Sequence, residues 1–318
     1  MEIVNATKRK VLNFLDKKGY QLLRTCELEE KVDYYRKVLI ESKIGKREEK
    51  IDSIVFSKDR AMQLHALLKS YIELVSCRGR MYVLYKTSSE RHAKSYEDLQ
   101  QIFADQDIVF VKEVDFRKQL IELCERSSAI TIGLYVDDMI FVNRLDYSKL
   151  IRVDTLNEVV SLGRDKELNY SVVLQQDQKV PDFFSKENGF EYFKWDFTKE
   201  HSDWTFPLGV SGYFFGRDEL VVMLNGIHFK APNSLEINLQ KYKPMFIHRF
   251  GVCMKKTCCV GVHANMVQSE FPNPVINTFS VEALLEKWED GLMIELEKFY
   301  GVSGAIAQFQ SYEFVKRS

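Results

Sequence analysis

The sequence holds little that would break or disorder a folded chain. It has only 6 prolines and 15 glycines in 318 residues and no low-complexity tract, which excludes a linker-like protein and indicates an ordered chain. No apolar stretch approaches the roughly 20 residues of a membrane span, and no continuous apolar core follows the basic residues near the N-terminus, as a secretory signal requires. The formal net charge is -1, so the chain lacks the positive footprint of a nucleic-acid-binding protein. These absences favour a cytoplasmic protein without a nucleic-acid partner.

The six cysteines lack the spacing of a structural zinc site. Cys253, Cys258 and Cys259 lie close together in the sequence, but not as the paired cysteines two residues apart that hold zinc. We therefore expect the cysteines to be reduced thiols with a structural role, as is usual in cytosolic proteins.

Residues 1–50 are more basic than acidic and have the pattern of two charged helices. We expect an N-terminal helical extension that packs on the rest of the protein. A basic amphipathic helix can also lie on an anionic membrane, so peripheral contact with the inner face of a membrane is the alternative.

After residue 50, predicted strands alternate with predicted helices. The strands are expected at residues 51–56, 81–86, 108–111 and 129–136, and the helices between them include 95–104 and 115–127. Such alternation is typical of right-handed crossovers in an α/β fold with a mainly parallel central sheet flanked by helices. Ligands bind beyond the carboxyl ends of the strands in such sheets. This places Ser57 to Arg60, Lys86 and the pair Asp137-Asp138 on one rim.

The pair Asp137-Asp138 is the most informative feature of the sequence. It closes the apolar run at residues 129–136, and Met139-Ile-Phe-Val after it is apolar again. Two ionised acids between such segments are costly to desolvate unless a cation or hydrogen-bond donors satisfy them. Paired carboxylates at a strand end commonly hold Mg²⁺ or Mn²⁺ against phosphate oxygens. An acidic turn without a ligand is the plainer interpretation.

Five stretches of this sequence resemble motifs of nucleotide-sugar glycosyltransferases of the GT-A fold, and in particular bacterial polysaccharide transferases related to family 2. They are Phe56-Ser-Lys-Asp-Arg-Ala-Met-Gln-Leu, Val136-Asp-Asp, Ser211-Gly-Tyr-Phe-Phe-Gly-Arg, Pro232-Asn-Ser-Leu-Glu and Val262-His-Ala-Asn-Met-Val-Gln. The resemblance implies a donor-binding half at residues 51–145 and an acceptor half with a C-terminal helix at 146–318, both in one globular domain. It also implies a nucleotide-diphosphate sugar donor, a glycan or lipid-linked acceptor, and Mn²⁺ or Mg²⁺ as cofactor.

The resemblance assigns roles to residues of the rim. The metal ligands it implies are Asp138, Asp137 and His263, and the donor contacts it implies are Ser57, Asp59, Arg60 and Asp137. Lys86 or Arg117 could add a cation for the donor phosphates. One departure matters, because Val136 stands where the family often has an acid. Ordinary surface charge is the alternative for Lys86 and Arg117, and loop capping of the following helix is the alternative for Asp59 and Arg60. A histidine that is only hydrogen-bonded is the alternative for His263.

An inverting transferase also needs a general base that deprotonates the acceptor hydroxyl. Glu236 resembles the family's base, an acid at the start of a helix on the acceptor side, and Asp218 is the reserve candidate. A structural role competes, because Asn233 as N-cap with Glu236 three residues later has the spacing of a capping box.

Three other functions compete with the transferase hypothesis. Val136 in place of an acid leaves open a catalytically inactive scaffold that binds a nucleotide or a partner. Tyr135-Val-Asp-Asp also resembles the catalytic hairpin of polymerase palm domains, which would need an antiparallel hairpin around the acids. A nucleotidyltransferase would begin with a glycine-rich phosphate loop, and residues 51–65 contain no glycine.

A helix predicted at 280–300 could pack on its own domain or on a second copy, so a homodimer is a candidate assembly.

Overall fold

A computed structural model describes residues 25–171, 174–183, 192–262, 264–265, 279–302, 308–309 and 311–317. The chain divides into two units, Met1–Ile44 and Gly45–Ser318. The first unit contains helix α2 (Thr25–Glu41), the second of the two helices predicted for residues 1–50, and the first lies outside the described residues. The division of the chain into parts at residues 50 and 145 stays a prediction. None of the described helices is long and apolar enough to span a membrane.

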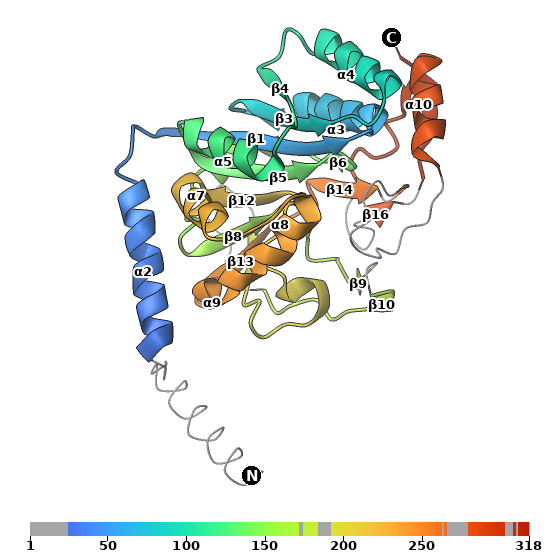
Figure 1. Cartoon of the computed structure of the whole chain (residues 1–318). Coiled ribbons are helices and arrows are strands. Elements are labelled where there is room, and N and C mark those ends of the chain that lie inside the picture. The colour runs from blue at the N-terminus through green and yellow to red at the C-terminus, as the bar shows by residue number, and fades with distance from the viewer. Residues whose placement is uncertain are drawn as a thin grey trace, which may run out of the picture. The chain divides into compact units, whose positions relative to one another are not determined.

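An eight-stranded sheet forms the centre of the second unit (Figure 1). Its strands, in spatial order, are β11 (Tyr192–Trp195), β13 (Phe250–Met254), β8 (Glu158–Ser161), β12 (Tyr213–Gly216), β5 (Ala129–Val136), β1 (Glu48–Lys58), β3 (Met81–Lys86) and β4 (Ile108–Lys112). The strands β5, β1, β3 and β4 are parallel to one another, and β12 is antiparallel to β5. The sheet confirms the predicted α/β class with a mainly parallel centre.

Helices cover both faces of the parallel strands. The chain steps from β1 to β3 to β4 in one direction through α3 (Ala61–Leu74) and α4 (Glu90–Ile102). It then steps back across the sheet to β5 through α5 (Phe116–Arg126). Because such crossovers are right-handed, the reversal puts α5 on the face opposite α3 and α4. Helix α7 (Arg217–Asn225) packs beside α5, and α10 (Val281–Glu289) packs on α3 and α4.

A smaller sheet joins β6 (Met139–Phe141), β14 (Cys259–Val262) and β16 (Gln308–Phe309). Strand β6 follows Asp138 directly, but it pairs antiparallel with β14 and belongs to a different sheet from β5. The hairpin that a polymerase palm requires around the acidic pair is therefore not formed by β5 and β6, and this alternative is wrong.

The remaining described elements are short. They are α6 (Tyr147–Leu150), α8 (Pro232–Leu239), α9 (Lys243–Phe246), the 3₁₀ helices η1 (Ser202–Thr205) and η2 (Gln240–Tyr242), and the strands β2 (Val75–Ser76), β7 (Leu145–Asp146), β9 (Tyr170–Ser171), β10 (Gln176–Asp177), β15 (Leu292–Ile294) and β17 (Phe314–Lys316).

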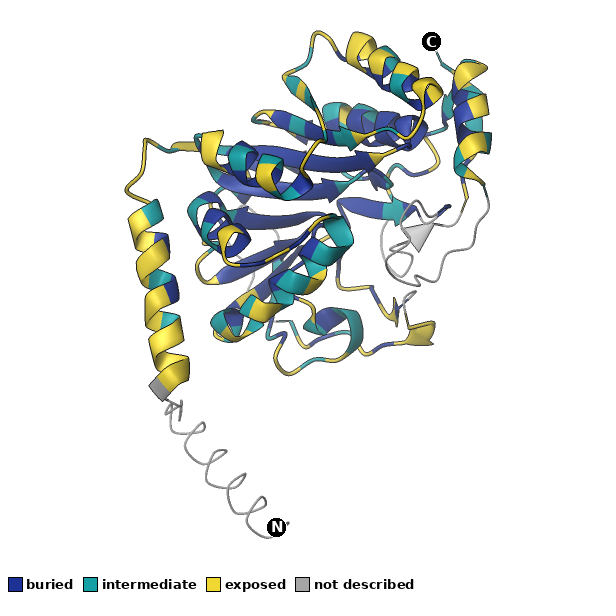
Figure 2. Ribbon diagram, viewed as in Figure 1, coloured by how far each residue is buried: buried dark blue, intermediate teal, exposed yellow. Residues whose placement is uncertain are grey.

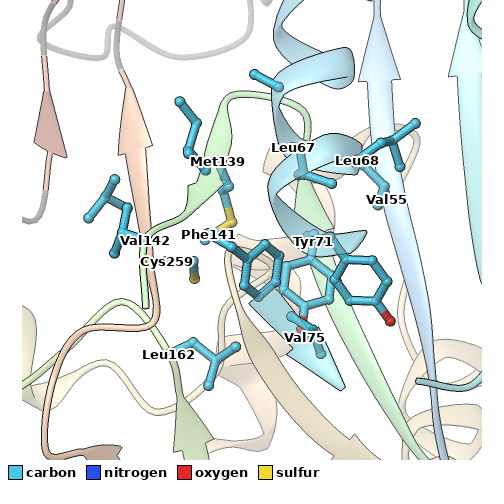
Figure 3. Packing of buried hydrophobic residues seen from close by; sticks show 14 of the residues in the cluster. Val55, Leu67, Leu68, Tyr71, Val75, Met139, Phe141, Val142, Leu162 and Cys259 are labelled. Atoms are coloured by element: carbon cyan, nitrogen blue, oxygen red, sulfur yellow. The ribbon is translucent and has the colours of Figure 1, made fainter. Parts of the chain in front are cut away.

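The hydrophobic core lies between α3, the central strands and the small sheet. Buried residues dominate β1, β5 and the inner face of α3, whereas the outer faces of α4 and α5 are exposed (Figure 2). In Figure 3, Tyr71 of α3 lies beside Phe141 of β6, and the two ring centroids are 5.3 Å apart. Leu67 and Cys259 are fully buried in the same cluster. Each large apolar side chain buried in this way contributes about 1.5–3 kcal/mol, so the core fixes α3 firmly against the strands.

Two predicted helices have different bounds in the structure. Helix α4 begins at Glu90 rather than at residue 95, because the Ser89 side chain accepts a hydrogen bond from the His92 N–H and caps the helix earlier. The helix predicted at 280–300 is wrong in its second half. Helix α10 ends at Glu289, Gly291 takes a left-handed backbone with φ of 77°, and the chain continues as strand β15, which pairs with β17.

Candidate functional site

The register of the central strands brings two separate loops together at one edge of the sheet. Phe56 of β1 pairs with Val136 of β5, and the Asp137 N–H continues the ladder by donating to the Phe56 carbonyl at 3.1 Å. Ser57 and Asp137 therefore lie side by side where these parallel strands end. The structure thus brings together Ser57, Asp59, Arg60, Asp137 and Asp138, as the strand pattern predicts, although 80 residues separate Ser57 from Asp137.

Asp137 is almost completely buried, with 4% of its surface exposed. Its carboxylate accepts hydrogen bonds from the Ser57 hydroxyl at 2.9 Å and from the Lys58 N–H at 3.1 Å. It also accepts one from Arg60 Nη1 at 3.0 Å. Burial raises the pKa of Asp137 to about 6, and the charge of Asp138 adds to this effect, while Arg60 and Ser57 oppose it. Asp137 is thus held in place from three sides.

Arg60 links the two acids. Its Nη1 lies 3.0 Å from Asp137 Oδ1 and 2.9 Å from Asp138 Oδ2, and its Nη2 donates to the Asn265 carbonyl at 2.6 Å. Burial alone would lower the pKa of Arg60, but the charges of Asp137 and Asp138 outweigh it and raise that pKa further, so the guanidinium stays charged. The side chain of Asp138 is more accessible than its neighbours, with 15% exposed against 8% for Arg60. Asp138 is the acid of the pair that a ligand can reach.

Asp59 turns the chain from strand β1 into helix α3. It is a non-glycine residue with a left-handed backbone, with φ of 55°, and its side chain accepts a hydrogen bond from the Ser88 N–H at 2.7 Å. The Tyr96 hydroxyl supports the same loop, because it accepts from the Arg60 N–H at 3.2 Å and hydrogen-bonds to the Ser57 hydroxyl. Backbone strain of this kind often marks a functional loop that its surroundings hold in shape.

Lys86 lies at the same edge but is engaged elsewhere. It ends strand β3 in register with Lys58 of β1, and its Nζ lies 3.1 Å from a carboxylate oxygen of Glu113. About half of the Lys86 side chain is exposed. An exposed ion pair of this kind is weak, so Lys86 keeps the freedom to turn toward an anionic ligand.

Arg117 and Asp218 have contacts away from the acidic pair. Arg117 donates to three backbone carbonyls at the C-terminal end of α7, those of Leu224, Asn225 and Ile227. Asp218 accepts hydrogen bonds from Arg47 and Arg217. It follows β12, which is antiparallel to β5, so Asp218 lies at the opposite edge of the sheet from Asp137. The structure does not bring Asp218 to the rim.

Glu236 lies in α8 and accepts a hydrogen bond from the Val210 N–H at 3.3 Å. Burial raises the pKa of Glu236, while the Val210 N–H and Arg164 oppose the shift. Two residues after Val210, the Gly212 N–H donates to the Leu134 carbonyl near the end of β5. Glu236 therefore contacts a segment that runs past the same edge as Asp137.

The capping alternative for Glu236 is not what the structure shows. Helix α8 begins at Pro232, so Asn233 is a helical residue rather than the N-cap. The Ser234 hydroxyl, not Glu236, accepts from the Ala231 N–H at the helix start.

The chemistry of the acidic pair fits a hard divalent cation, although Arg60 now lies between the two carboxylates. Carboxylate oxygens are the ligands that Mg²⁺ and Mn²⁺ prefer, and one or two carboxylates suffice when phosphates and waters complete the shell. Within the described ranges no group of three or more His, Cys, Asp or Glu side chains gathers as a metal site. His263, the third predicted ligand, lies outside the described residues. Asp138 and Asp137 can therefore hold such an ion together with ligand oxygens, provided that Arg60 yields its place.

Several polar residues around Arg60 were not predicted from the sequence. Asn265 supplies a carbonyl to Arg60, and its side-chain oxygen accepts from Gln63 at 3.0 Å. The Tyr312 hydroxyl donates to the Val262 carbonyl at 3.2 Å nearby. Gln63 has the helical spacing of a core position in α3, and no motif marks Asn265 or Tyr312. The three-dimensional structure is needed to show that these residues lie around the site.

One curated protein is similar in sequence to most of this chain. It is the bifunctional glycosyltransferase pgtA of Dictyostelium discoideum, 24% identical over 274 residues that cover 75% of this chain. The chain resembles a glycosyltransferase. The predicted resemblance to a glycosyltransferase is confirmed by this relative, and the chain spans about a third of the relative's length, 35%. No family model matches the sequence.

Three solved structures are similar to parts of this chain. TarS residues 1–349 of S. aureus has a TM-score of 0.42 at 8% identity, covering 65% of this chain and 58% of that one. GalNAc-T7 in complex with UDP, GalNAc and Mn²⁺ has a TM-score of 0.46 at 9% identity, covering 75% and 47%. The mannosyltransferase PcManGT of Pyrobaculum calidifontis, in complex with GDP-Man and Mn²⁺, has a TM-score of 0.28 at 14% identity, covering 43% and 44%.

Proposed function

We propose that this chain is a metal-dependent glycosyltransferase that moves a sugar from a nucleotide-diphosphate donor to an acceptor hydroxyl. The observation that carries the proposal is the convergence of Ser57, Asp59, Arg60, Asp137 and Asp138 at the carboxyl ends of β1 and β5. Ligands of open α/β sheets bind at this edge. The sequence similarity to a glycosyltransferase supports the same conclusion.

In this proposal Asp138 and Asp137 hold Mn²⁺ or Mg²⁺ next to the donor diphosphate. The bound ion would act as a Lewis acid that stabilises the charge developing on the leaving phosphate oxygens. The chain's own residues prepare this edge. Ser57 and the Lys58 N–H fix the orientation of Asp137, and the carboxylate of Asp138 is the more accessible of the two. Asp59, Arg60 and Lys86 supply polar and cationic contacts for the nucleotide, whereas Arg117 caps the C-terminal end of α7.

Glu236 is the general base of the proposal. It would accept the proton of the acceptor hydroxyl while that oxygen attacks the anomeric carbon, which inverts the configuration. Its raised pKa favours this role, because a base with a pKa nearer to neutral pH is a better proton acceptor than an ordinary carboxylate. Residues 146–318, which include α8, would form the acceptor half, and residues 51–145 the donor half.

The acceptor in the proposal is a glycan or a lipid-linked sugar of polysaccharide biosynthesis in the cytoplasm. Peripheral contact with a membrane would involve the N-terminal segment, of which residues 1–24 lie outside the described part. A homodimer through α10 is part of the same proposal, although Trp288 is already buried against the chain's own α3 and α4.

Calorimetric titration with UDP-, GDP- and dTDP-sugars, each with Mn²⁺ and with EDTA, tests the proposal. We expect one donor class to bind with Mn²⁺ and to bind much more weakly with EDTA. The matched variant Asp138→Asn should lose the manganese dependence while remaining folded. Absence of binding by every donor under both conditions would overturn the transferase proposal in favour of an inactive scaffold.

A further inference from the structure

Arg60 occupies the place between the two acids where a metal ion would act. We propose that Arg60 is a built-in counter-cation of the pair Asp137-Asp138, and that it excludes a divalent ion until a nucleotide diphosphate draws it away. This inference rests on the proposed function, because it assumes that the acids are metal ligands. It assigns Arg60 a positioning role that couples the binding of metal to the binding of donor.

The first step of the argument concerns charge. Two carboxylates with one guanidinium leave a net charge of about -1 at the pair, and the contacts of 3.0 and 2.9 Å engage one oxygen of each acid. All three side chains are at least 85% buried, since their exposed fractions are 8%, 5% and 15%. Water therefore screens the group poorly. A divalent ion that joined this group would meet the repulsion of a fixed cation within a few ångströms, so its affinity must be low while Arg60 stays.

The second step concerns the alternative partner of Arg60. Its Nε is buried and has no hydrogen-bond partner among the described residues. An unsatisfied buried donor costs about 1–3 kcal/mol, so the arrangement around Arg60 is incomplete as it stands. A phosphate group presents several acceptor oxygens to the planar fork of a guanidinium, and such pairs are among the strongest charge-assisted hydrogen bonds. A diphosphate therefore competes with the two acids for Arg60 and offers an acceptor to the Nε that they leave unsatisfied.

The third step concerns the position of Arg60 in the chain. It is the N-cap residue of α3, and the structure shows no side-chain cap on this helix. Rotation of the Arg60 side chain would break no capping contact, and the helix would stay anchored by its buried face. The contacts that the movement breaks are those of the guanidinium with the two acids and with the Asn265 carbonyl. The consequence of the movement is that nucleotide releases the carboxylates for the metal at the moment when the metal can bridge to phosphate.

Linkage makes the inference measurable. If nucleotide increases the affinity for Mn²⁺ by some factor, Mn²⁺ must increase the affinity for nucleotide by the same factor. We expect the wild-type chain to bind Mn²⁺ weakly alone and at least about tenfold more tightly in the presence of UDP or GDP, whichever of the two it binds. Electron paramagnetic resonance of free Mn²⁺, or calorimetry, measures these constants without catalysis.

Two variants separate the charge of Arg60 from its shape. Arg60→Gln removes the charge but keeps an amide that can donate to one acid, and Arg60→Lys keeps the charge with a different shape. We expect Arg60→Gln to bind Mn²⁺ without nucleotide about tenfold or more tightly than wild type, and to lose most of the coupling to nucleotide. Arg60→Lys should bind Mn²⁺ without nucleotide as weakly as wild type.

Equal affinity of wild type, Arg60→Gln and Arg60→Lys for Mn²⁺ without nucleotide would overturn the inference. If Arg60→Gln does not fold, wild type still decides, because tight binding of Mn²⁺ without nucleotide would overturn it equally. Failure of the proposed function would give a different result, since Mn²⁺ would then not bind at Asp138 in any variant, with or without nucleotide. The control Asp138→Asn identifies that case.

Discussion

Replacement of Arg249 by methionine should destabilise the protein by about 3–5 kcal/mol. Arg249 and Glu219 form a fully buried ion pair with two hydrogen bonds, of 2.8 and 2.6 Å, and their side chains are 0% and 2% exposed. Arg249 also donates to the Thr155 carbonyl at 2.9 Å and lies 3.8 Å from the ring centroid of Phe246. Methionine fills similar volume but removes the Arg249 guanidinium from the buried Glu219 carboxylate, and this lost charge compensation is the source of the destabilisation.

Urea unfolding followed by circular dichroism measures this loss. The matched control is Arg91→Met, which removes a similar two-bond pair with Glu289 at a surface where the side chains are 54% and 42% exposed. We expect little change for the control, because exposed ion pairs contribute little. The double variant Arg249→Met/Glu219→Met should recover most of the stability, since neither charge of this pair remains buried. A loss below about 1 kcal/mol in Arg249→Met would refute the reasoning.

Three further predictions concern the site and the pH dependence of stability. Asp138→Asn should abolish transfer but leave the thermal midpoint nearly unchanged or raised, because the substitution removes one of two clustered acids and Arg60 still pairs with the other. An activity assay and calorimetric unfolding measure the two effects. Full activity would contradict the assignment of Asp138 as a metal ligand. Glu236→Gln should stop transfer yet spare donor binding. The rate of the wild type should fall as the pH drops through the raised pKa of Glu236, while its affinity for the donor stays the same, and a pH–rate profile measured beside donor binding tests this. Burial lowers the pKa of His65 to about 4, so the unfolded state takes up its proton first as pH falls below its ordinary value of 6.5. The free energy of unfolding should fall by about 2 kcal/mol between about pH 7.5 and about pH 5. Urea unfolding at several pH values measures this fall, and an equal dependence on pH in a His65→Gln variant would rule the explanation out.

The sequence predicts the parallel half of the sheet well. Strands β3 and β5 have the predicted bounds, residues 81–86 and 129–136, because each is an apolar run bounded by polar residues. Strands β8 and β13 were not predicted. Strand β8 is only four residues long and includes the charged Glu158, which is buried and pairs with Lys194 of β11. A local pattern cannot show that such a charge is satisfied by a distant residue.

The candidate site was predicted in its position but not in its contacts. The ends of β1 and β5 were expected to meet, because parallel strands end at the same edge. The bridge from Arg60 to both acids spans 77 and 78 residues of sequence, and the contact with Asn265 spans 205. No spacing rule covers such distances, since they depend on how the second half folds back over the first. The predicted helix through residue 300 failed for a simpler reason, because apolar residues continue past Gly291 as strand β15.

The backbone of Asp59 limits which residues evolution can place at this position. A left-handed conformation, with φ of 55°, costs most residues energy, and Asp and Asn tolerate it best after glycine. Only a short side chain with an acceptor oxygen can also reach the Ser88 N–H, which Asp59 does at 2.7 Å. Homologous chains that bind the same ligand should therefore carry Asp or Asn here. Chains with glycine would keep the turn but lose the tie to the start of α4, and a branched residue at this position would mark a lineage in which the loop has taken another shape.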